Sequence, residues 1–161
     1  MRIFKPEDYQ QKVTQVYTSL HDQLSGHFPK AKIEHIGSSA IQGALSKGDL
    51  DIYLEVEPDQ FLETLEGLQR DFGFSIKRDT LRTDSLCMLI QVIDQVDVAI
   101  QLVKKGSEFN MFILFRDRMN ADSKLVQQYN RLKLAYHDQP GDLYRQKKSS
   151  FISNVLKQKE S

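Results

Sequence analysis

The segment from Asp49 to Val56 alternates strictly between polar and apolar residues, and its first two polar residues are aspartates separated by one leucine. A β-strand directs alternate side chains to opposite faces, so this segment predicts a strand with Asp49 and Asp51 on one face and an apolar set on the other. Two carboxylates held side by side repel each other, and a divalent cation such as Mg²⁺, which prefers hard oxygen ligands, removes that cost. The segment therefore predicts a sheet strand that carries a candidate metal site.

A Gly-Ser pair precedes this strand, with Gly37 and Ser38 followed by Ser39. Residues 33–36 predict a short strand, and residues 38–45 predict a helix that begins at the serines. Free backbone N–H groups at a helix N-terminus, together with the helix dipole, attract phosphate. A phosphate-binding turn followed by metal-binding carboxylates indicates a site that transfers nucleotides.

A third candidate ligand, Asp97, lies in another alternating segment, from Val96 to Val103, whose apolar residues predict a core face. If the two strands are neighbours, Asp97 lies beside Asp49 and Asp51. The alternative interpretation is two half-buried strands whose aspartates are simply solvated.

A Gly-Ser turn, an Asp-x-Asp strand and a lone aspartate on a later strand together resemble the DNA polymerase β-like nucleotidyltransferases. In that superfamily the three carboxylates hold two metal ions, which lie roughly 3.5–4 Å apart in two-metal sites. The Gly-Ser helix start binds the triphosphate of the incoming nucleotide. The resemblance thus implies Asp49, Asp51 and Asp97 as catalytic metal ligands and Gly37, Ser38 and Ser39 as nucleotide-binding residues.

The flanking residues narrow the resemblance to the GrpB family, a bacterial branch of that superfamily. The family typically shows Glu-His-Ile/Val-Gly-Ser-Thr-Ala-Val-Pro-Gly, then a lysine and an Asp-Ile pair. Residues 34–43 are similar to that signature, with Ser39 in place of threonine and Gln42 in place of proline, and Lys47 and Asp51 are retained.

Matching residue types continue into the C-terminal third, so the resemblance covers most of the chain from Ile33 to Leu156. One segment departs from the pattern, because many GrpB members carry a His-rich strand where this chain has residues 85–92. Since this chain keeps all three aspartates, it looks more like an active nucleotidyltransferase than those members do.

Four basic residues are candidates for contacting the triphosphate, whose charge two metal ions do not fully neutralise. Lys133 follows Tyr129 by four residues near an apolar helical stripe, and Lys148 has the same relation to a second tyrosine. Arg116 follows an apolar run, and these three residues occupy positions that match the GrpB pattern. Lys47 precedes the aspartate strand. The alternative for Lys133 and Lys148 is a stem that covers core surface with its ammonium in water, and the alternative for Lys47 is a solvated turn lysine.

Lysine and arginine together number 22, as do aspartate and glutamate, so the formal net charge is zero. Domains that bind nucleic acid usually carry a basic excess or stripe. The balance argues against long DNA or RNA and favours a small-molecule or protein acceptor. The sequence fixes neither the acceptor nor the oligomeric state.

The histidines show neither His-x-His nor His-Glu-x-x-His spacing, so the sequence gives no sign of a zinc site. His35, next to the Gly-Ser pair, is expected to anchor the turn through a backbone hydrogen bond, and contact with a phosphate or nucleobase is the alternative. The single Cys87 and a charged N-terminus without a signal peptide favour the cytoplasm. The longest apolar run, residues 111–115, is too short to cross a membrane.

The length of 161 residues suits a single domain, 1–161, with a core at about 30–105 and C-terminal helices at about 108–158. We predict an α/β (α+β) fold, in which a small mixed β-sheet of nucleotidyltransferase type has flanking helices and a helical C-terminal segment. The remaining predicted elements are a helix at 6–26, a helix from 58 to about 71, a short strand at 74–77, and a hairpin of strands 86–93 and 96–103 around Asp94-Gln95.

The sequence therefore predicts a Mg²⁺-dependent nucleotidyltransferase that transfers NMP from an NTP to an unidentified acceptor and releases pyrophosphate. Asp49 and Asp51 would bind both ions, and Asp97 would complete the second ion's site or accept the proton of the acceptor hydroxyl. Two alternatives stay open. One is a non-catalytic nucleotide-binding or regulatory module of the same fold, and the other is a phosphotransferase that moves a pyrophosphate or γ-phosphate group.

Overall fold

The structure is a computed structural model that describes residues 2–158, in which five α-helices surround a five-stranded sheet. The helices are α1 (Pro6–His27), α2 (Phe61–Arg70), α3 (Met111–Asn120), α4 (Ser123–Tyr136) and α5 (Leu143–Lys157). The strands are β1 (Lys32–Ile36), β2 (Leu50–Val56), β3 (Ser75–Ile76), β4 (Leu86–Ile93) and β5 (Val96–Lys104). Short 3₁₀ turns occupy Ser38–Ala40, Pro58–Gln60 and Glu108–Asn110.

The sheet has the strand order β1-β2-β5-β4-β3, and it is mixed because β2 and β5 run parallel while the other neighbours run antiparallel. The predicted α/β fold with a small mixed sheet is therefore confirmed. Asp94 and Gln95 form the predicted two-residue turn between β4 and β5, both with positive φ, which is the geometry of a tight hairpin.

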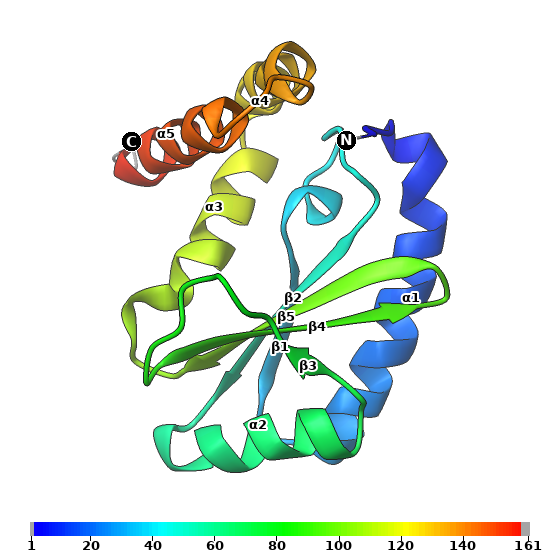
Figure 1. Cartoon of the computed structure of the whole chain (residues 1–161), viewed down its shortest axis with the longest axis vertical. Coiled ribbons are helices and arrows are strands. Elements are labelled where there is room, and N and C mark those ends of the chain that lie inside the picture. Colours follow the sequence, from blue (N-terminus) through cyan, green and yellow to red (C-terminus); the bar gives the residue numbers. More distant parts are fainter. Residues whose placement is uncertain (1, 159–161) are drawn as a thin grey trace.

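The two faces of the sheet have different coverings (Figure 1). One face packs on α1 and α2, where Leu50, Ile52 and Leu54 of β2 are fully buried in the main core. Helix α1 contributes Val13, Val16, Leu20 and Leu24 at helical spacing to the same core. The other face is approached by the three C-terminal helices, which pack among themselves and against the segment after β1. The predicted alternation of β2 thus separates a core face from the face that carries Asp51.

The predicted helix at 38–45 is wrong, because only Ser38–Ala40 form a single 3₁₀ turn. Ile41 has extended backbone angles and Gly43 has a φ of +82°, so the chain cannot continue as a helix. We call residues 37–46 the turn segment. Apart from that 3₁₀ turn it connects β1 to β2 without regular secondary structure, and its position depends on contacts with the C-terminal helices.

The C-terminal third is helical, as predicted, and forms three helices after β5. Across residues 2–158, none of the helices combines the length and the apolar character needed to span a membrane.

Candidate functional site

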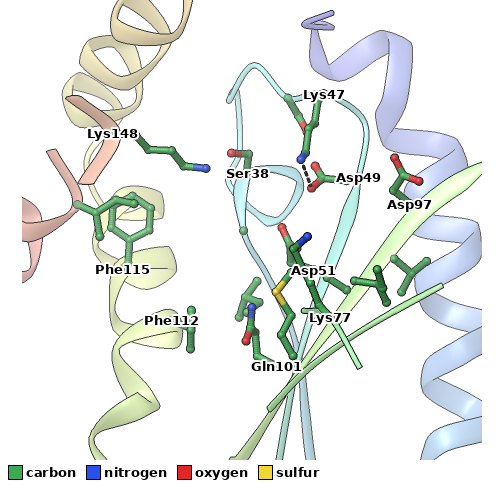
Figure 2. A pocket seen from close by; sticks show the side chains of 18 of the residues that line it. Ser38, Lys47, Asp49, Asp51, Lys77, Asp97, Gln101, Phe112, Phe115 and Lys148 are labelled. Atoms are coloured by element: carbon green, nitrogen blue, oxygen red, sulfur yellow. Dashed lines mark ion pairs between the residues drawn. The ribbon is translucent and has the colours of Figure 1, made fainter. Parts of the chain in front are cut away.

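A cavity of about 850 Å³, here called the cleft, lies between the open face of the sheet and the C-terminal helices (Figure 2). Its lining includes Asp49, Asp51 and Asp97 from the sheet side and Gly37 and Ser38 from the turn segment. It also includes the three predicted lysines, Lys47, Lys133 and Lys148. Residues that the sequence separates by more than a hundred positions therefore meet in one cavity.

Gly37 lies directly against the Asp51 carboxylate. Asp51 is the antiparallel partner of Ile36, so the turn begins one residue after that pair. A side chain at Gly37 would overlap Asp51 Oδ2 and would lie 3.0 Å from Asp51 Cγ. Gly37 also has a φ of +76°, in the region that favours glycine. Glycine is thus required here both by backbone conformation and by the close approach to Asp51.

The two aspartates at the start of β2 form a pair that suits a hard cation. Burial and the negative charge of Asp49 raise the pKa of Asp51 to about 7, although the positive charges of Lys148 and Lys47 oppose this shift. Lys47 Nζ lies 3.7 Å from Asp49 Oδ2 and is more than half exposed, so it is a weak partner. Carboxylate oxygens that repel each other fit Mg²⁺, which would relieve the repulsion.

Asp97 lies on the same face of the sheet as Asp51 but farther along the cleft. Asp51 is the parallel partner of Ala99, and Asp97 precedes Ala99 by two residues. Its side chain is exposed, and Figure 2 shows it beyond Asp49 as seen from Ser38. Between residues 2 and 158, no three acidic, His or Cys side chains are grouped closely enough to hold a metal ion. A preformed three-carboxylate cluster is therefore absent from that range.

Lys133 reaches the turn segment from α4. Its side chain is only 3% exposed, and its Nζ donates hydrogen bonds to Ser38 Oγ at 2.7 Å and to the Leu45 carbonyl. The ammonium also lies 4.1 Å from the centre of the Tyr129 ring. Burial and the nearby Lys148 lower the pKa of Lys133 to about 7, while Asp49 opposes this. Lys133 is thus part of the cleft wall rather than a lysine whose ammonium is in water.

Lys148 extends from α5 into the cleft, and Figure 2 shows its side chain directed toward Ser38. Its positive charge acts on both Asp51 and Lys133. Among the described residues its ammonium has no hydrogen-bond or ion-pair partner, so it is free to meet an anionic ligand.

Two further residues hold the turn segment, and the sequence analysis did not identify them. Asn120 of α3 accepts a hydrogen bond from Gln42 N at 2.8 Å and donates one to the Ala40 carbonyl at 3.1 Å. Asn130 of α4 accepts from Leu45 N at 2.8 Å and donates to the Gly43 carbonyl at 3.0 Å. Each amide therefore replaces backbone bonds that a helix would have supplied.

The spacing Asn130-x-x-Lys133 was the available signal for this role. Residues three apart lie on the same helix face, so an asparagine and a lysine at this spacing indicate one polar patch beside the apolar stripe. Tyr129, on the same stripe, is 2% exposed. The sequence shows a polar pair beside a buried tyrosine. It does not show that this pair contacts the turn segment.

Ser39 and Arg116 do not line the cleft, unlike the other predicted site residues. Ser39 Oγ is hydrogen-bonded to His35 Nε2 at 2.8 Å, so the His35 ring anchors the turn through a side chain and not through the backbone bond that was expected. Arg116 Nη1 donates to the His35 carbonyl at 2.9 Å and lies 3.3 Å from Glu34 Oε2. Its guanidinium also pairs with Asp117. The contacts with His35 and Glu34 join α3 to β1.

The neutral state of His35 follows from its surroundings. Its ring stacks on Tyr17, with ring centres 4.9 Å apart and planes at 25°. Burial and the positive charge of Arg116 lower the pKa of His35 to about 4. At neutral pH the imidazole is therefore uncharged, which suits a structural hydrogen bond to Ser39.

A family model described as GrpB protein matches residues 5–158. A UPF0157 protein from Vibrio cholerae serotype O1 is 43% identical over 158 residues, which cover 98% of this chain and 83% of that protein. The crystal structure of the conserved protein GrpB from Enterococcus faecalis aligns with a TM-score of 0.76 at 18% identity, covering 97% of this chain and 95% of that chain.

Larger enzymes share the fold over part of their length. The Cid1 poly(U) polymerase, in a mutant bound to MgATP, aligns with a TM-score of 0.59 at 17% identity over 84% of this chain and 43% of that chain. Cid1 in complex with its short product ApU gives 0.59 at 18% identity, over 84% and 42%. This chain therefore has a nucleotidyltransferase-like fold and spans less than half of the Cid1 chains. The family model and the relative at 43% identity together show that the chain belongs to the GrpB family.

Proposed function

We propose that this GrpB protein is a Mg²⁺-dependent nucleotidyltransferase that transfers NMP from an NTP to an acceptor. One observation carries the proposal. Asp51 lies against Gly37, and both Asp49 and Asp51 line a cleft that Lys133 and Lys148 also line. The cleft thus joins a candidate cation site to two basic side chains, which is the combination that an Mg²⁺–triphosphate needs.

The triphosphate is proposed to bind between the turn segment and helices α4 and α5. Lys148 has a free ammonium that can pair with phosphate oxygens, and Lys133 holds Ser38 in place while presenting its own positive charge. Ser38 Oγ adds a hydroxyl that can donate to phosphate. Lys47, at the entrance beside Asp49, is proposed to contribute charge at longer range.

Asp49 and Asp51 are the proposed ligands of Mg²⁺, because their paired oxygens are the donors that this ion prefers. Bound there, Mg²⁺ would neutralise the carboxylates and polarise the phosphoryl oxygens. The two-ion arrangement stays a prediction, since within residues 2–158 no three acidic, His or Cys side chains are grouped closely enough to hold a metal ion.

The proposed step is an in-line displacement at the α-phosphate. The acceptor hydroxyl oxygen forms a bond to the α-phosphorus, and the bond between that phosphorus and the α–β bridging oxygen breaks. Pyrophosphate leaves with the bonding electrons, and the hydroxyl proton passes to a carboxylate. Asp97 is proposed as this base, because it lines the cleft and its exposed carboxylate can accept a proton.

The test is transfer of label from [α-³²P]NTP in the presence of Mg²⁺, read as pyrophosphate release and as labelled product. Binding of Mg²⁺ with a non-hydrolysable NTP analogue is measured in parallel by calorimetry. Asp51→Asn should weaken that binding while the fold is kept. If this variant binds the nucleotide with unchanged affinity in the presence of Mg²⁺, Asp51 is not part of an Mg²⁺·NTP site and the proposal is wrong.

A second candidate is a nucleotide-binding module without turnover. The separation of Asp97 from the Asp49–Asp51 pair favours it, since no three-carboxylate group is present within residues 2–158. Binding of Mg²⁺·NTP without pyrophosphate release, across a broad range of acceptors, would select this candidate. In either case the cytoplasm is the proposed location, on the basis of the single free Cys87.

A further inference from the structure

We propose that the acceptor is a small molecule with an apolar body and one anionic group, and that it binds on the β5-β4-β3 side of the cleft. This inference rests on the proposed function, because it divides one cleft into a nucleotide half and an acceptor half. The nucleotide half contains the turn segment, Lys133 and Lys148. The acceptor half begins on the other side of Asp51.

The strand register describes the floor of the acceptor half. Asp51 pairs with Ala99, Ala99 pairs with Ile90, and Ile90 pairs with Ser75, so these four residues form one row across β2, β5, β4 and β3. Neighbouring strands lie about 4.8 Å apart, which makes the row about 14 Å long. Ala99 has the smallest side chain in the row, and it leaves space for a ligand beside the Asp51 carboxylate. A molecule about 10 Å long can lie on this floor with its hydroxyl at the aspartate end of the row.

The acceptor half is lined by apolar side chains that are open to solvent. Ile90 is 38% exposed and Val92, near the end of β4, is 66% exposed, and both line the cleft. Met111, at the start of α3, is 36% exposed and also lines it, next to Phe112. Exposed apolar side chains gathered in a cavity bury themselves against an apolar ligand. They fit the body of a small molecule better than a charged chain.

One basic side chain, Lys77, lies at the far end of this floor. Lys77 N donates to the Met88 carbonyl, and Met88 pairs with Gln101, so Lys77 ends the row next to that of Asp51. The ammonium of Lys77 has no hydrogen-bond or ion-pair partner among residues 2–158. It is the single basic residue that β3, β4 and β5 and their immediate ends contribute to the lining. A single anionic group on the acceptor is its natural partner.

This distribution of charge disfavours a polynucleotide acceptor. A nucleic-acid strand is held by several phosphate contacts along a basic groove. The acceptor half offers one lysine together with Asp97, and the chain as a whole has zero formal net charge. We therefore expect the protein not to bind RNA tightly, and tight RNA binding would contradict the inference.

The test uses 1-anilinonaphthalene-8-sulfonate as probe, since it combines an apolar body with one sulfonate. Fluorescence titration measures its affinity for the full chain, with and without Mg²⁺ and a non-hydrolysable ATP analogue, whose own affinity is measured by calorimetry. The variants are Ile90→Asn and Lys77→Met. The matched control is Leu62→Asn, at a leucine 71% exposed on α2. A 15-nucleotide RNA is titrated separately.

We expect the probe and the nucleotide to bind together. Ile90→Asn should weaken the probe about tenfold and Lys77→Met about threefold, and Leu62→Asn should change nothing. The inference would be overturned if the probe affinity were unchanged in both Ile90→Asn and Lys77→Met, or if the probe competed with the nucleotide. Tight binding of the RNA would also overturn it. If the probe binds as described but the nucleotide does not, the proposed function fails while the apolar acceptor floor stands.

Discussion

Lys133 Nζ donates a 2.7 Å hydrogen bond to Ser38 Oγ, and this contact joins α4 to the start of the turn segment across 95 positions of sequence. The same ammonium donates to the Leu45 carbonyl, near the other end of the segment. Because residues 37–46 lack regular secondary structure, their conformation depends on such contacts from outside. The turn segment and the C-terminal helices therefore form one structural unit.

Lys133→Met keeps most of the side-chain stem and removes the charge. We expect the affinity for Mg²⁺·NTP to fall by roughly 1.5–3 kcal/mol, the range for hydrogen bonds to charged groups. A solvated surface lysine could be removed with little effect on stability. Lys133 is buried, however, so its loss leaves the Leu45 carbonyl without this donor and should cost about 1 kcal/mol in the free energy of unfolding. Calorimetry and urea denaturation measure the two effects.

Lys124→Met is the matched control, because Lys124 is an exposed lysine on the same helix. It should leave both quantities unchanged. Equal nucleotide affinity in wild type and Lys133→Met would limit Lys133 to holding the turn segment.

The sequence was sufficient wherever local pattern decides structure. Alternation gave β2 and the face of Asp51, and helical spacing gave α1, because periodicity directly reflects which side is buried. It was insufficient for residues 38–45, where Ala40, Ala44 and Leu45 favour a helix by propensity. Side-chain amides that lie at least 78 positions away override that preference.

The candidate site shows the same division. Gly37 and Asp51, which the sequence analysis assigned to one site, are close in space because β1 and β2 are antiparallel neighbours and Asp51 pairs with Ile36. Arg116, by contrast, has the type and position of a phosphate ligand, yet it lies outside the cleft lining and pairs with Glu34. Residue type alone does not distinguish an arginine that binds a ligand from one that joins two elements.

Gly37→Ala tests the approach of the turn to Asp51. Alanine at this position must accept a φ of +76° and must also displace the Asp51 carboxylate. We expect a loss of stability larger than the roughly 1 kcal/mol of backbone strain alone, together with loss of Mg²⁺·NTP binding. Gly106→Ala is the control, since Gly106 has a φ of +85° with no atom within 4 Å of the added group. Similar losses for the two variants would mean that strain alone acts at Gly37.

Asp51→Asn tests the raised pKa of Asp51. Since burial and Asp49 raise that pKa from 3.8 to about 7, the folded state binds more protons than the unfolded state between these values. The stability contribution of Asp51 is therefore present below pH 3.8 and is lost as the pH rises through 7. One pKa unit corresponds to about 1.4 kcal/mol. Without Mg²⁺ and above pH 7, the free energy of unfolding of Asp51→Asn should thus exceed that of wild type by at least about 1 kcal/mol.

Urea denaturation with EDTA at pH 4.5 and pH 8 measures this difference. The lowered pKa of His35 has the opposite effect on stability, but it is common to both proteins and cancels. Asp97→Asn removes an exposed aspartate from the same face and should show no such gain. A stability difference that does not grow between the two pH values would contradict the assigned origin of the shift.

Asn130→Leu tests whether the amide clamp orders the turn segment for ligand binding. The change keeps side-chain size but removes the bonds to Leu45 N and the Gly43 carbonyl. We expect faster amide hydrogen exchange across residues 38–46, a stability loss of about 1–3 kcal/mol, and about tenfold weaker Mg²⁺·NTP binding. Val13→Ala, in the core between α1 and the sheet, supplies a comparable stability loss away from the turn segment. Because only the asparagine variant disturbs the phosphate-binding turn, it alone should lose nucleotide affinity at temperatures well below unfolding. Equal affinities in the two destabilised proteins would show that Asn130 supports the fold and not the site.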